Sequence, residues 1–436
     1  MPWRKIPNTE ARYALVCFDE NGTERCDDRD APGGHFSDKV IGEVRAHPPT
    51  DVFLFSHGWK GDVVGAVKQY DRWIGAFVNR QADRARMEAR RPGFVPLYVG
   101  LHWPSLPFGD EEIGAGANFA AQPGSGAALV ELYAKRLGDS PEVRAALAVI
   151  FEEARTNAAA DMLTDKARNA YIQLDKALAL GNSELGGPPD ADREPFDPDA
   201  AVETSAELGV DFGGLDLGGA MLAPLRQLSF WTMKKRARTV GEGGMHTFVK
   251  NLQSVSPKIR VHLMGHSFGC IVMSSVLGGP GGSTPLVRPI DSCVLVQGAM
   301  SLWSFSQDIP PSPGTSGYFR RVIDDGKVSG PIVVTISRFD TAVGRLYPVA
   351  AGLAQQVAFA GLPKYGAIGA FGIHGVEGAA AQKMLPADVN YQFQARKVYN
   401  LESSEFIRKG SGLSGAHSDI DGPEVAHVIW QAATPV

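Results

Sequence analysis

The sequence lacks a surplus of basic residues. Its 436 residues include 43 Lys and Arg against 48 Asp and Glu, a formal net charge of −5. Such a chain has no general attraction to nucleic acid or to an anionic membrane, so we expect a small molecule or a protein as its partner and no nucleic acid. Hydrophobic residues make up 44% and charged residues 21%, which is typical of a globular protein. The length allows two or three domains, or one large α/β domain with insertions.

Cysteine is scarce as well. The four cysteines are Cys17, Cys26, Cys270 and Cys293. They are too few for a disulfide scaffold and show no spacing typical of a metal site. We therefore expect free thiols in a reducing compartment, which indicates a cytoplasmic protein.

A targeting segment and an uninterrupted membrane span are also missing. The first 22 residues contain no apolar segment followed by a cleavage site of small residues, so secretion by a standard signal is not expected. Residues 346–363 carry no charge over about the minimum length of a spanning helix. Pro348, Gly352 and Gly361 interrupt this stretch. The sequence therefore predicts no integral membrane association.

Short apolar runs alternate with helical patterns near both ends of the chain. These runs predict strands at residues 12–18, 51–55, 95–102, 259–264, 293–296, 332–336 and 397–401. Strands that alternate with helices imply right-handed crossovers and a mostly parallel central sheet flanked by helices. We thus expect an α/β fold whose ligands bind beyond the carboxyl ends of the strands.

Residues 104–240 have a different texture. Apolar stripes at helical spacing follow Ser140 and Leu163, and residues 217–238 predict an apolar helix with a basic end. Residues 182–211 form an acidic linker rich in Pro and Gly, with Arg193 its only base. We expect a helical lid or cap with one mobile connection, inserted into a core of residues 1–103 and 241–436.

The most informative motif is Gly-His-Ser-Phe-Gly at residues 265–269, between a predicted strand and a good helix start. A turn this tight leaves no room for side chains on either side of the serine, which accounts for Gly265 and Gly269. It would lift the Ser267 hydroxyl above the sheet and aim the N-terminus of the next helix at it, where the helix dipole favours developing negative charge. Ser267 is the predicted nucleophile, and the alternative is an ordinary turn serine.

This motif resembles the nucleophile elbow of the α/β-hydrolase superfamily, in which nucleophile, acid and histidine follow in that order along the chain. Asp340 stands just beyond the predicted strand 332–336, and His417 lies on the loop beyond the last predicted strand. The resemblance implies that Ser267 attacks, His417 acts as base and Asp340 holds the histidine. Their rivals fit the order less well: Asp308, Asp324 and Asp325 do not stand at a strand end, His374 lies before the last strand, and His427 lies in the terminal helix pattern.

The turn Ser56-His57-Gly58-Trp59 follows an early predicted strand and resembles the family's oxyanion turn. The resemblance implies that the backbone N–H groups of Trp59 and Phe268 bind the carbonyl oxygen. One feature departs from the family: the insertion precedes the elbow, whereas the usual cap follows the strand after the nucleophile. It still leaves from the carboxyl end of a strand, so it begins on the side of the site.

Further residues near these motifs are candidates for binding the substrate. They are His57, His266 and Trp103 beside the motifs, and Met221 and Leu225 on the predicted lid helix, whose apolar face is larger than a solvated helix should show. We also considered His57, His102 and the group around His417 and Asp419 as metal ligands. No His-x-x-x-His or Cys-x-x-Cys pattern accompanies them, so no metal is predicted.

Together these features predict a serine hydrolase that cleaves carboxylic esters through an acyl-enzyme and needs no cofactor. Serine at the elbow argues against a dehalogenase or an epoxide hydrolase, whose relatives use a carboxylate there. A lipase or an amidase with the same three residues stays open, because the motifs define the chemistry and not the leaving group. A non-catalytic binding module that uses the insertion as a partner surface is the alternative from another class.

Overall fold

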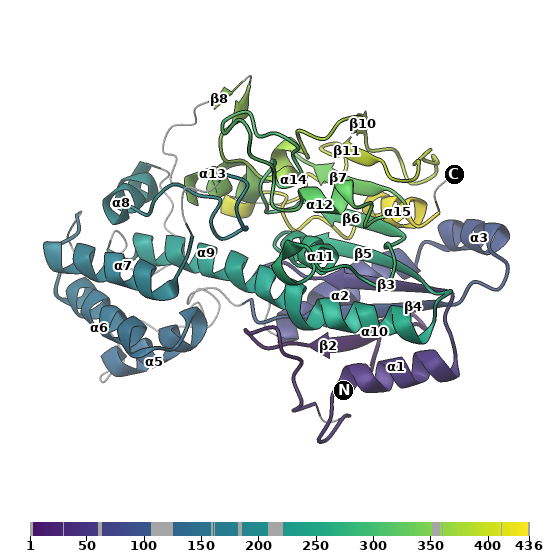
Figure 1. Cartoon of the computed structure of the whole chain (residues 1–436), viewed down its shortest axis with the longest axis horizontal. Coiled ribbons are helices and arrows are strands. Elements are labelled where there is room, and N and C mark those ends of the chain that lie inside the picture. The colour runs from purple at the N-terminus through teal and green to yellow at the C-terminus, as the bar shows by residue number, and fades with distance from the viewer. Residues whose placement is uncertain are drawn as a thin grey trace.

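A computed structural model of the chain describes residues 3–28, 30–59, 63–105, 125–157, 160, 162–181, 185–207, 221–350, 358–359, 361–410 and 412–434. In this part of the chain, nine strands form one sheet in the order β1-β2-β4-β3-β5-β6-β7-β11-β10 (Figure 1). Here β1 is antiparallel to β2 and the other neighbours are parallel. Helices flank the sheet, so the α/β class and the mostly parallel sheet are as the sequence predicts.

The strands are β1 (Trp3–Lys5), β2 (Arg12–Cys17), β3 (Asp51–Ser56), β4 (Pro96–His102), β5 (Arg260–His266), β6 (Ser292–Val296), β7 (Ile332–Ile336), β10 (Ala380–Lys383) and β11 (Val398–Glu402). A separate hairpin pairs β8 (Ala358–Phe359) with β9 (Leu362–Pro363). The seven predicted strands correspond to β2 to β7 and β11. All six residues of β3 are buried, as expected of a strand covered on both faces. Because β3 pairs with β5 so that Ser56 lies opposite Gly265, the two strands end side by side.

Each face of the sheet carries its own hydrophobic core. One core packs the sheet against α1 (Phe36–Ala46), α10 (His246–Val255) and α11 (Gly269–Gly278); the other packs it against α2 (Val63–Val78), α3 (Gln81–Arg90) and α15 (Pro423–Ala432). Short helices α12 (Arg320–Asp324), α13 (Tyr347–Ala350) and α14 (Ile368–Phe371) lie in the loops after β6 and β7. Alternate residues of β3 enter the two cores, with Leu54 in the first and Phe53 in the second. This alternation is the pleat of a strand with two buried faces.

The insertion is helical, as predicted. Its helices are α5 (Ser125–Leu137), α6 (Pro141–Thr156), α7 (Asp165–Leu178), α8 (Pro198–Glu207) and the first part of α9 (Ala223–Val240), and they enclose a third core. Figure 1 shows them at one end of the molecule, with α9 leading from them toward the sheet. The acidic segment is more structured than its composition predicts, because α8 lies within it and residues 190–193 are all buried.

The end of the insertion differs from the prediction. Helix α9 continues through a π-helical turn, η2 (Gly241–Met245), directly into α10, with a kink at Gly243. Leu228 of α9 packs in the core of the insertion, whereas Ala237 packs in a core of the sheet. The boundary expected at residue 240 therefore falls inside a helical run that belongs to both parts.

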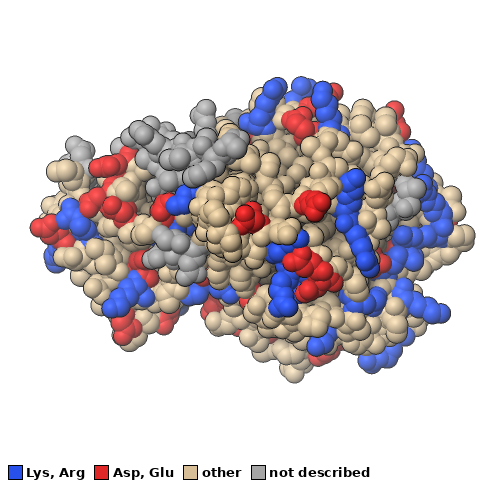
Figure 2. All heavy atoms as spheres, turned by 45° about the horizontal axis from the view of Figure 1, so that its top comes forward, with Lys and Arg blue, Asp and Glu red and all other residues tan. Residues whose placement is uncertain are grey.

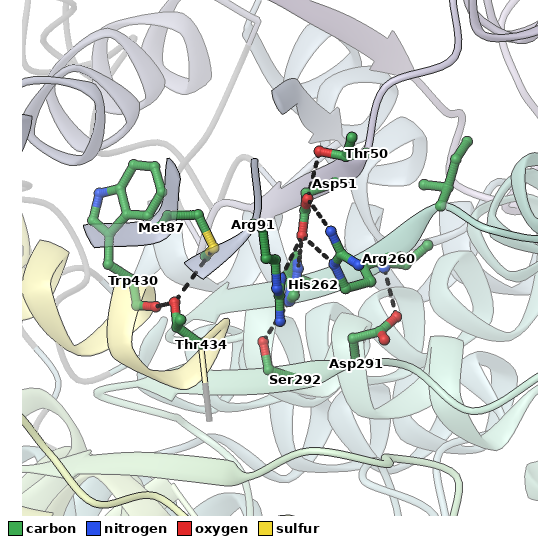
Figure 3. A network of polar contacts seen from close by, with 12 residues as sticks. Thr50, Asp51, Met87, Arg91, Arg260, His262, Asp291, Ser292, Trp430 and Thr434 are labelled. Atoms are coloured by element: carbon green, nitrogen blue, oxygen red, sulfur yellow. Dashed lines mark hydrogen bonds and ion pairs between the residues drawn. The ribbon is translucent and has the colours of Figure 1, made fainter. Parts of the chain in front are cut away.

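A network of charged side chains lies at the end of the sheet where β3 and β5 begin, opposite the turn that carries Ser267 (Figure 3). Asp51, at the start of β3, is fully buried and accepts hydrogen bonds from Arg91 at 2.9 Å and from Arg260 at 2.9 and 3.0 Å. His262 lies 3.1 Å from the same carboxylate. Burial alone would raise the pKa of Asp51, but hydrogen bonds from His262 and Arg260 outweigh it and hold the pKa below its usual range. The network ties β3 to β5 at their first residues.

No helix in the described residues is both long and apolar enough to cross a membrane. Residues 346–363, the uncharged stretch long enough to be considered as a membrane span, lie partly outside the described residues. The described part of this stretch contains α13 and the β8–β9 hairpin. On the face drawn in Figure 2, Lys and Arg side chains lie among Asp and Glu side chains.

Candidate active site

The turn between β5 and α11 is as tight as the sequence predicts. Ser267 has φ +56°, in the left-handed region that non-glycine residues rarely adopt. A Cβ atom built on Gly265 would lie 2.5 Å from the Gly269 oxygen, and one built on Gly269 would lie 2.3 Å from the Ser56 oxygen. Any side chain at either position would displace backbone. Non-glycine residues held at such angles cost about 1–3 kcal/mol and cluster at functional sites.

Ser267, His417 and Asp340 form one chain of hydrogen bonds. His417 Nε2 lies 2.7 Å from Ser267 Oγ, and His417 Nδ1 lies 2.7 Å from Asp340 Oδ2. An ionised carboxylate only accepts, so Nδ1–H donates to Asp340 and Nε2 accepts the Ser267 hydroxyl proton. The three side chains selected in the sequence thus meet, with the imidazole oriented to remove a proton from serine.

Asp340 is held by a residue that the sequence analysis missed. Gln297 Nε2 donates a 2.8 Å hydrogen bond to Asp340 Oδ2, and the backbone N–H of Val343 donates to Oδ1 at 3.2 Å. Gln297 is fixed in turn by Thr335, whose hydroxyl accepts from its backbone N–H and donates to its side chain, both at 3.0 Å. The available signal was slight: one polar residue immediately after the buried strand β6.

His266, next to Ser267, supports the loop that carries His417. Its Nε2–H donates to the backbone oxygen of His417 at 2.8 Å, and its Nδ1 accepts from Gln69 Nε2 at 3.0 Å. Burial, followed by the nearby His417, lowers the pKa of His266 to about 3. The ring is therefore neutral near pH 7 and keeps the tautomer that these two bonds require. The structure shows His266 as a support of this loop, and the substrate contact predicted for it stays a prediction.

The turn at residues 57–59 passes directly against Ser267. A Cβ atom built on Gly58 would lie 2.6 Å from Ser267 Cβ and 3.1 Å from the His266 oxygen. The ring of Trp59 stacks on that of Phe268, with centroids 5.6 Å apart. Among the described residues, neither backbone N–H of Trp59 or Phe268 has an acceptor. Both groups predicted to bind an oxyanion thus lie beside Ser267 and stay available.

His57 and Trp103 lie beneath this turn. His57 is fully buried, its Nδ1–H donates to Gly58 O at 2.8 Å, and its Nε2 lies 3.0 Å from His102 Nδ1. Trp103 Nε1 donates to His57 O at 3.1 Å, and the two rings stack. Burial holds the pKa of His102 well below its usual value, so that ring is neutral. These contacts make His57 and Trp103 supports of the turn, and their predicted contacts with a substrate stay predictions.

The helix α9 presents a different residue to the site than expected. Met221 and Leu225 are buried in the core of the insertion, where Tyr171 donates to the Met221 oxygen. The ring of Phe230 instead lies 5.1 Å from that of Phe268 and 5.7 Å from that of Trp59. The structure thus places Met221 and Leu225 in the core of the insertion and Phe230 beside Trp59 and Phe268, while the substrate contacts predicted for Met221 and Leu225 stay predictions.

The rival acids and histidines have other partners. His427 pairs with Asp83 at 2.7 Å, His374 bonds to Phe371 O, Asp324 pairs with Arg320, Asp325 pairs with Arg321, and Asp308 accepts from Gly314 N. Asp419 accepts from two backbone N–H groups at residues 408 and 409, which stabilises the loop of His417. No group of three His, Cys, Asp or Glu side chains that could hold a metal ion occurs in the described part of the chain.

Comparisons with protein-family models, with curated proteins and with solved structures found no match to this chain. The functional argument therefore rests on the geometry of the site. Its elements are the strained serine, the hydrogen-bonded histidine and aspartate, and two N–H groups beside the serine.

Proposed function

We propose that this protein is a serine hydrolase of the α/β-hydrolase type that cleaves carboxylic esters. The observation that carries the proposal is the pair of 2.7 Å bonds that joins Ser267 Oγ, both nitrogens of His417 and the Asp340 carboxylate. It is reinforced by the φ of +56° at Ser267, a strained conformation that a structural serine does not need.

In the proposed reaction, Ser267 Oγ attacks the ester carbonyl while His417 Nε2 takes its proton. Asp340 stabilises the imidazolium that forms, and Gln297 keeps the carboxylate in position. His417 then gives the proton to the leaving alcohol, which leaves an acyl group on Ser267. Water attacks this acyl-enzyme with His417 again as base, and the acid and free serine are released.

The negative charge that develops on the carbonyl oxygen has two donors, the N–H groups of Trp59 and Phe268. Phe268 directly precedes α11, so the positive end of that helix dipole adds to the stabilisation. A single donor of this kind is worth about 100- to 1,000-fold in kcat. The rings of Trp59, Phe268 and Phe230 form an aromatic wall beside these donors, which suits an apolar acyl chain.

Hydrolysis of a soluble p-nitrophenyl ester tests the proposal. We expect wild-type protein to release p-nitrophenol and both Ser267→Ala and His417→Ala to lose at least about a thousandfold in kcat, because the three residues act as a unit. His374→Ala is the matched control, since the side chain of His374 hydrogen-bonds to the Phe371 oxygen and to none of Ser267, Asp340 and His417, and should keep its activity. Activity that survives in Ser267→Ala would show that the nucleophile lies elsewhere.

A further inference from the structure

Helix α9 carries a buried lysine that the proposed reaction does not use. Lys234 is fully buried, and its Nζ donates a 2.8 Å hydrogen bond to the Tyr347 hydroxyl. The same Nζ lies 4.2 Å from the centre of the Trp231 ring. Burial lowers the pKa of Lys234 to about 7, against the opposing effect of Asp192 and Asp190. Charged groups are rarely buried without polar partners, so we expect polar groups to surround Lys234.

Polar groups around Lys234 are available for a ligand. Asp192 is 3% exposed, and neither of its carboxylate oxygens has a hydrogen-bond partner in the described structure; the same holds for the buried Tyr365 hydroxyl. The charge of Asp192 acts on Lys234 and on the hydroxyls of Tyr347 and Tyr365. Burial raises the pKa of Asp192. The nearby Ser301 offsets this rise only in part, and the two side chains do not form a hydrogen bond of normal geometry. We call Asp192, Lys234, Tyr347 and Tyr365 the polar cluster.

Phe230 connects the polar cluster to the elbow. Phe230 and Lys234 are four residues apart, so they share one face of α9 about 6 Å apart along its axis. The Phe230 ring lies 5.1 Å from the Phe268 ring, and Lys234 Nζ lies 5.9 Å from the Phe230 ring. The Tyr347 ring also packs against Phe230, at 5.8 Å. One aromatic ring thus separates the elbow from the polar cluster.

The position of α9 indicates which half of an ester would reach the cluster. Phe230 contacts Trp59 and Phe268, which supply the two oxyanion donors. The leaving alcohol must depart beside His417, because His417 gives it a proton. An acyl chain that extends away from His417 and along Phe230 would reach the polar cluster.

We propose that the polar cluster is an acyl subsite and that it binds a hydroxyl group carried on the acyl chain. A hydroxyl can donate to Asp192 and accept from Lys234 or from the unpaired Tyr365 hydroxyl, whereas a carboxylate would be repelled by Asp192 and a cation by Lys234. This inference rests on the proposed ester hydrolysis and names its substrate class: esters of hydroxylated acids. The cluster is closed to solvent, so Phe230 or residues 190–193 move when such a chain enters.

The test compares p-nitrophenyl esters of ω-hydroxyalkanoic acids with those of plain alkanoic acids of equal chain length. The readout is the ratio of kcat/KM for the hydroxy ester to that for the plain ester. We expect the ratio to exceed about 10 at one chain length in wild-type protein, because a buried polar site rejects a ligand that leaves it unpaired. Asp192→Leu and the nearly isosteric Tyr365→Phe should both bring it close to one.

Asp175→Asn is the matched control. Asp175 accepts a 2.6 Å hydrogen bond from Arg193, the neighbour of Asp192, so this change loosens the same segment without altering the cluster, and the ratio should stay high. A wild-type ratio near one at every chain length, with both esters hydrolysed, would overturn the proposed subsite. The polar cluster would then bind no hydroxyl group of the substrate. A high ratio that survives in Tyr365→Phe would overturn the subsite as well. Failure to hydrolyse either ester would instead contradict the proposed function itself.

Discussion

Substitution of Gly58 by alanine tests the oxyanion turn with a change of a single methyl group. The added Cβ would lie 2.6 Å from Ser267 Cβ, so the turn and the serine must separate by about 0.8 Å to restore an ordinary contact of about 3.4 Å. The His266 oxygen at 3.1 Å blocks escape to that side. A misplacement of about 1 Å at a reacting centre costs about 100-fold in rate. We therefore expect Gly58→Ala to lower kcat about 100-fold with little change in KM.

The assay is steady-state hydrolysis of a p-nitrophenyl ester, with thermal unfolding followed in parallel. Gly42→Ala is the control, because Gly42 is exposed on α1 and a Cβ there has no neighbour within 4 Å. This control should keep full activity and gain up to about 1 kcal/mol in the free energy of unfolding. If folded Gly58→Ala kept kcat within twofold of wild type, the turn at residues 57–59 would not be the oxyanion site.

Three further predictions follow from the supporting contacts. Gln297→Leu removes the hydrogen bond to Asp340 and should lower kcat about tenfold or more at nearly constant KM, since such bonds to charged groups are worth about 1.5–3 kcal/mol; an unchanged kcat would refute the positioning role. Because the pKa of His266 is about 3 in the folded protein and near 6.5 when unfolded, the unfolded chain binds the proton first as pH falls. The free energy of unfolding should therefore lose up to about 1.4 kcal/mol per pH unit between about pH 6.5 and 3 and none above, and denaturant unfolding of His266→Asn should lack this component. Asp51→Asn should lower the free energy of unfolding by about 2–4 kcal/mol, which is less than for a fully buried ion pair because Arg91 and Arg260 are partly exposed. The kcat of the folded protein should stay unchanged, and a marked loss of kcat would show that the network affects the site.

The turn that carries Ser267 could be predicted because local steric constraints require specific residues in the sequence. Gly265 and Gly269 are required by contacts of 2.5 and 2.3 Å, so the elbow appears as a motif between a strand and a helix. The resemblance to the α/β-hydrolase order pointed to Asp340 and His417, each beyond a predicted strand. Parallel strands end at one edge of the sheet and bring their following loops together. Gln297 belongs to no pattern, and its role depends on a neighbouring strand that the linear sequence does not identify.

The insertion was less predictable because helix faces depend on what packs against them. The hydrophobic pattern of residues 217–238 does not show that Leu225 faces the insertion and Phe230 the elbow. The glycines at 241–244 read as a helix end, since glycine disfavours a helix by about 1 kcal/mol. In the structure they permit close packing instead: a Cβ on Gly241 would lie 2.5 Å from Val272 O, and one on Gly244 would lie 2.3 Å from Gly22 O. Tertiary contacts outweigh the local preference there.

Covalent labelling by a fluorophosphonate tests the central claim most directly, because the reagent reacts with a serine activated by a histidine and an oxyanion site. We predict that native protein takes up one phosphonyl group, that peptide mass analysis places it on Ser267, and that heat-unfolded protein and His417→Ala stay unlabelled. Ser254→Ala, which alters an exposed serine on α10, should be labelled like wild type. Native protein that stays unlabelled, or that is labelled on a serine other than Ser267, would contradict the account.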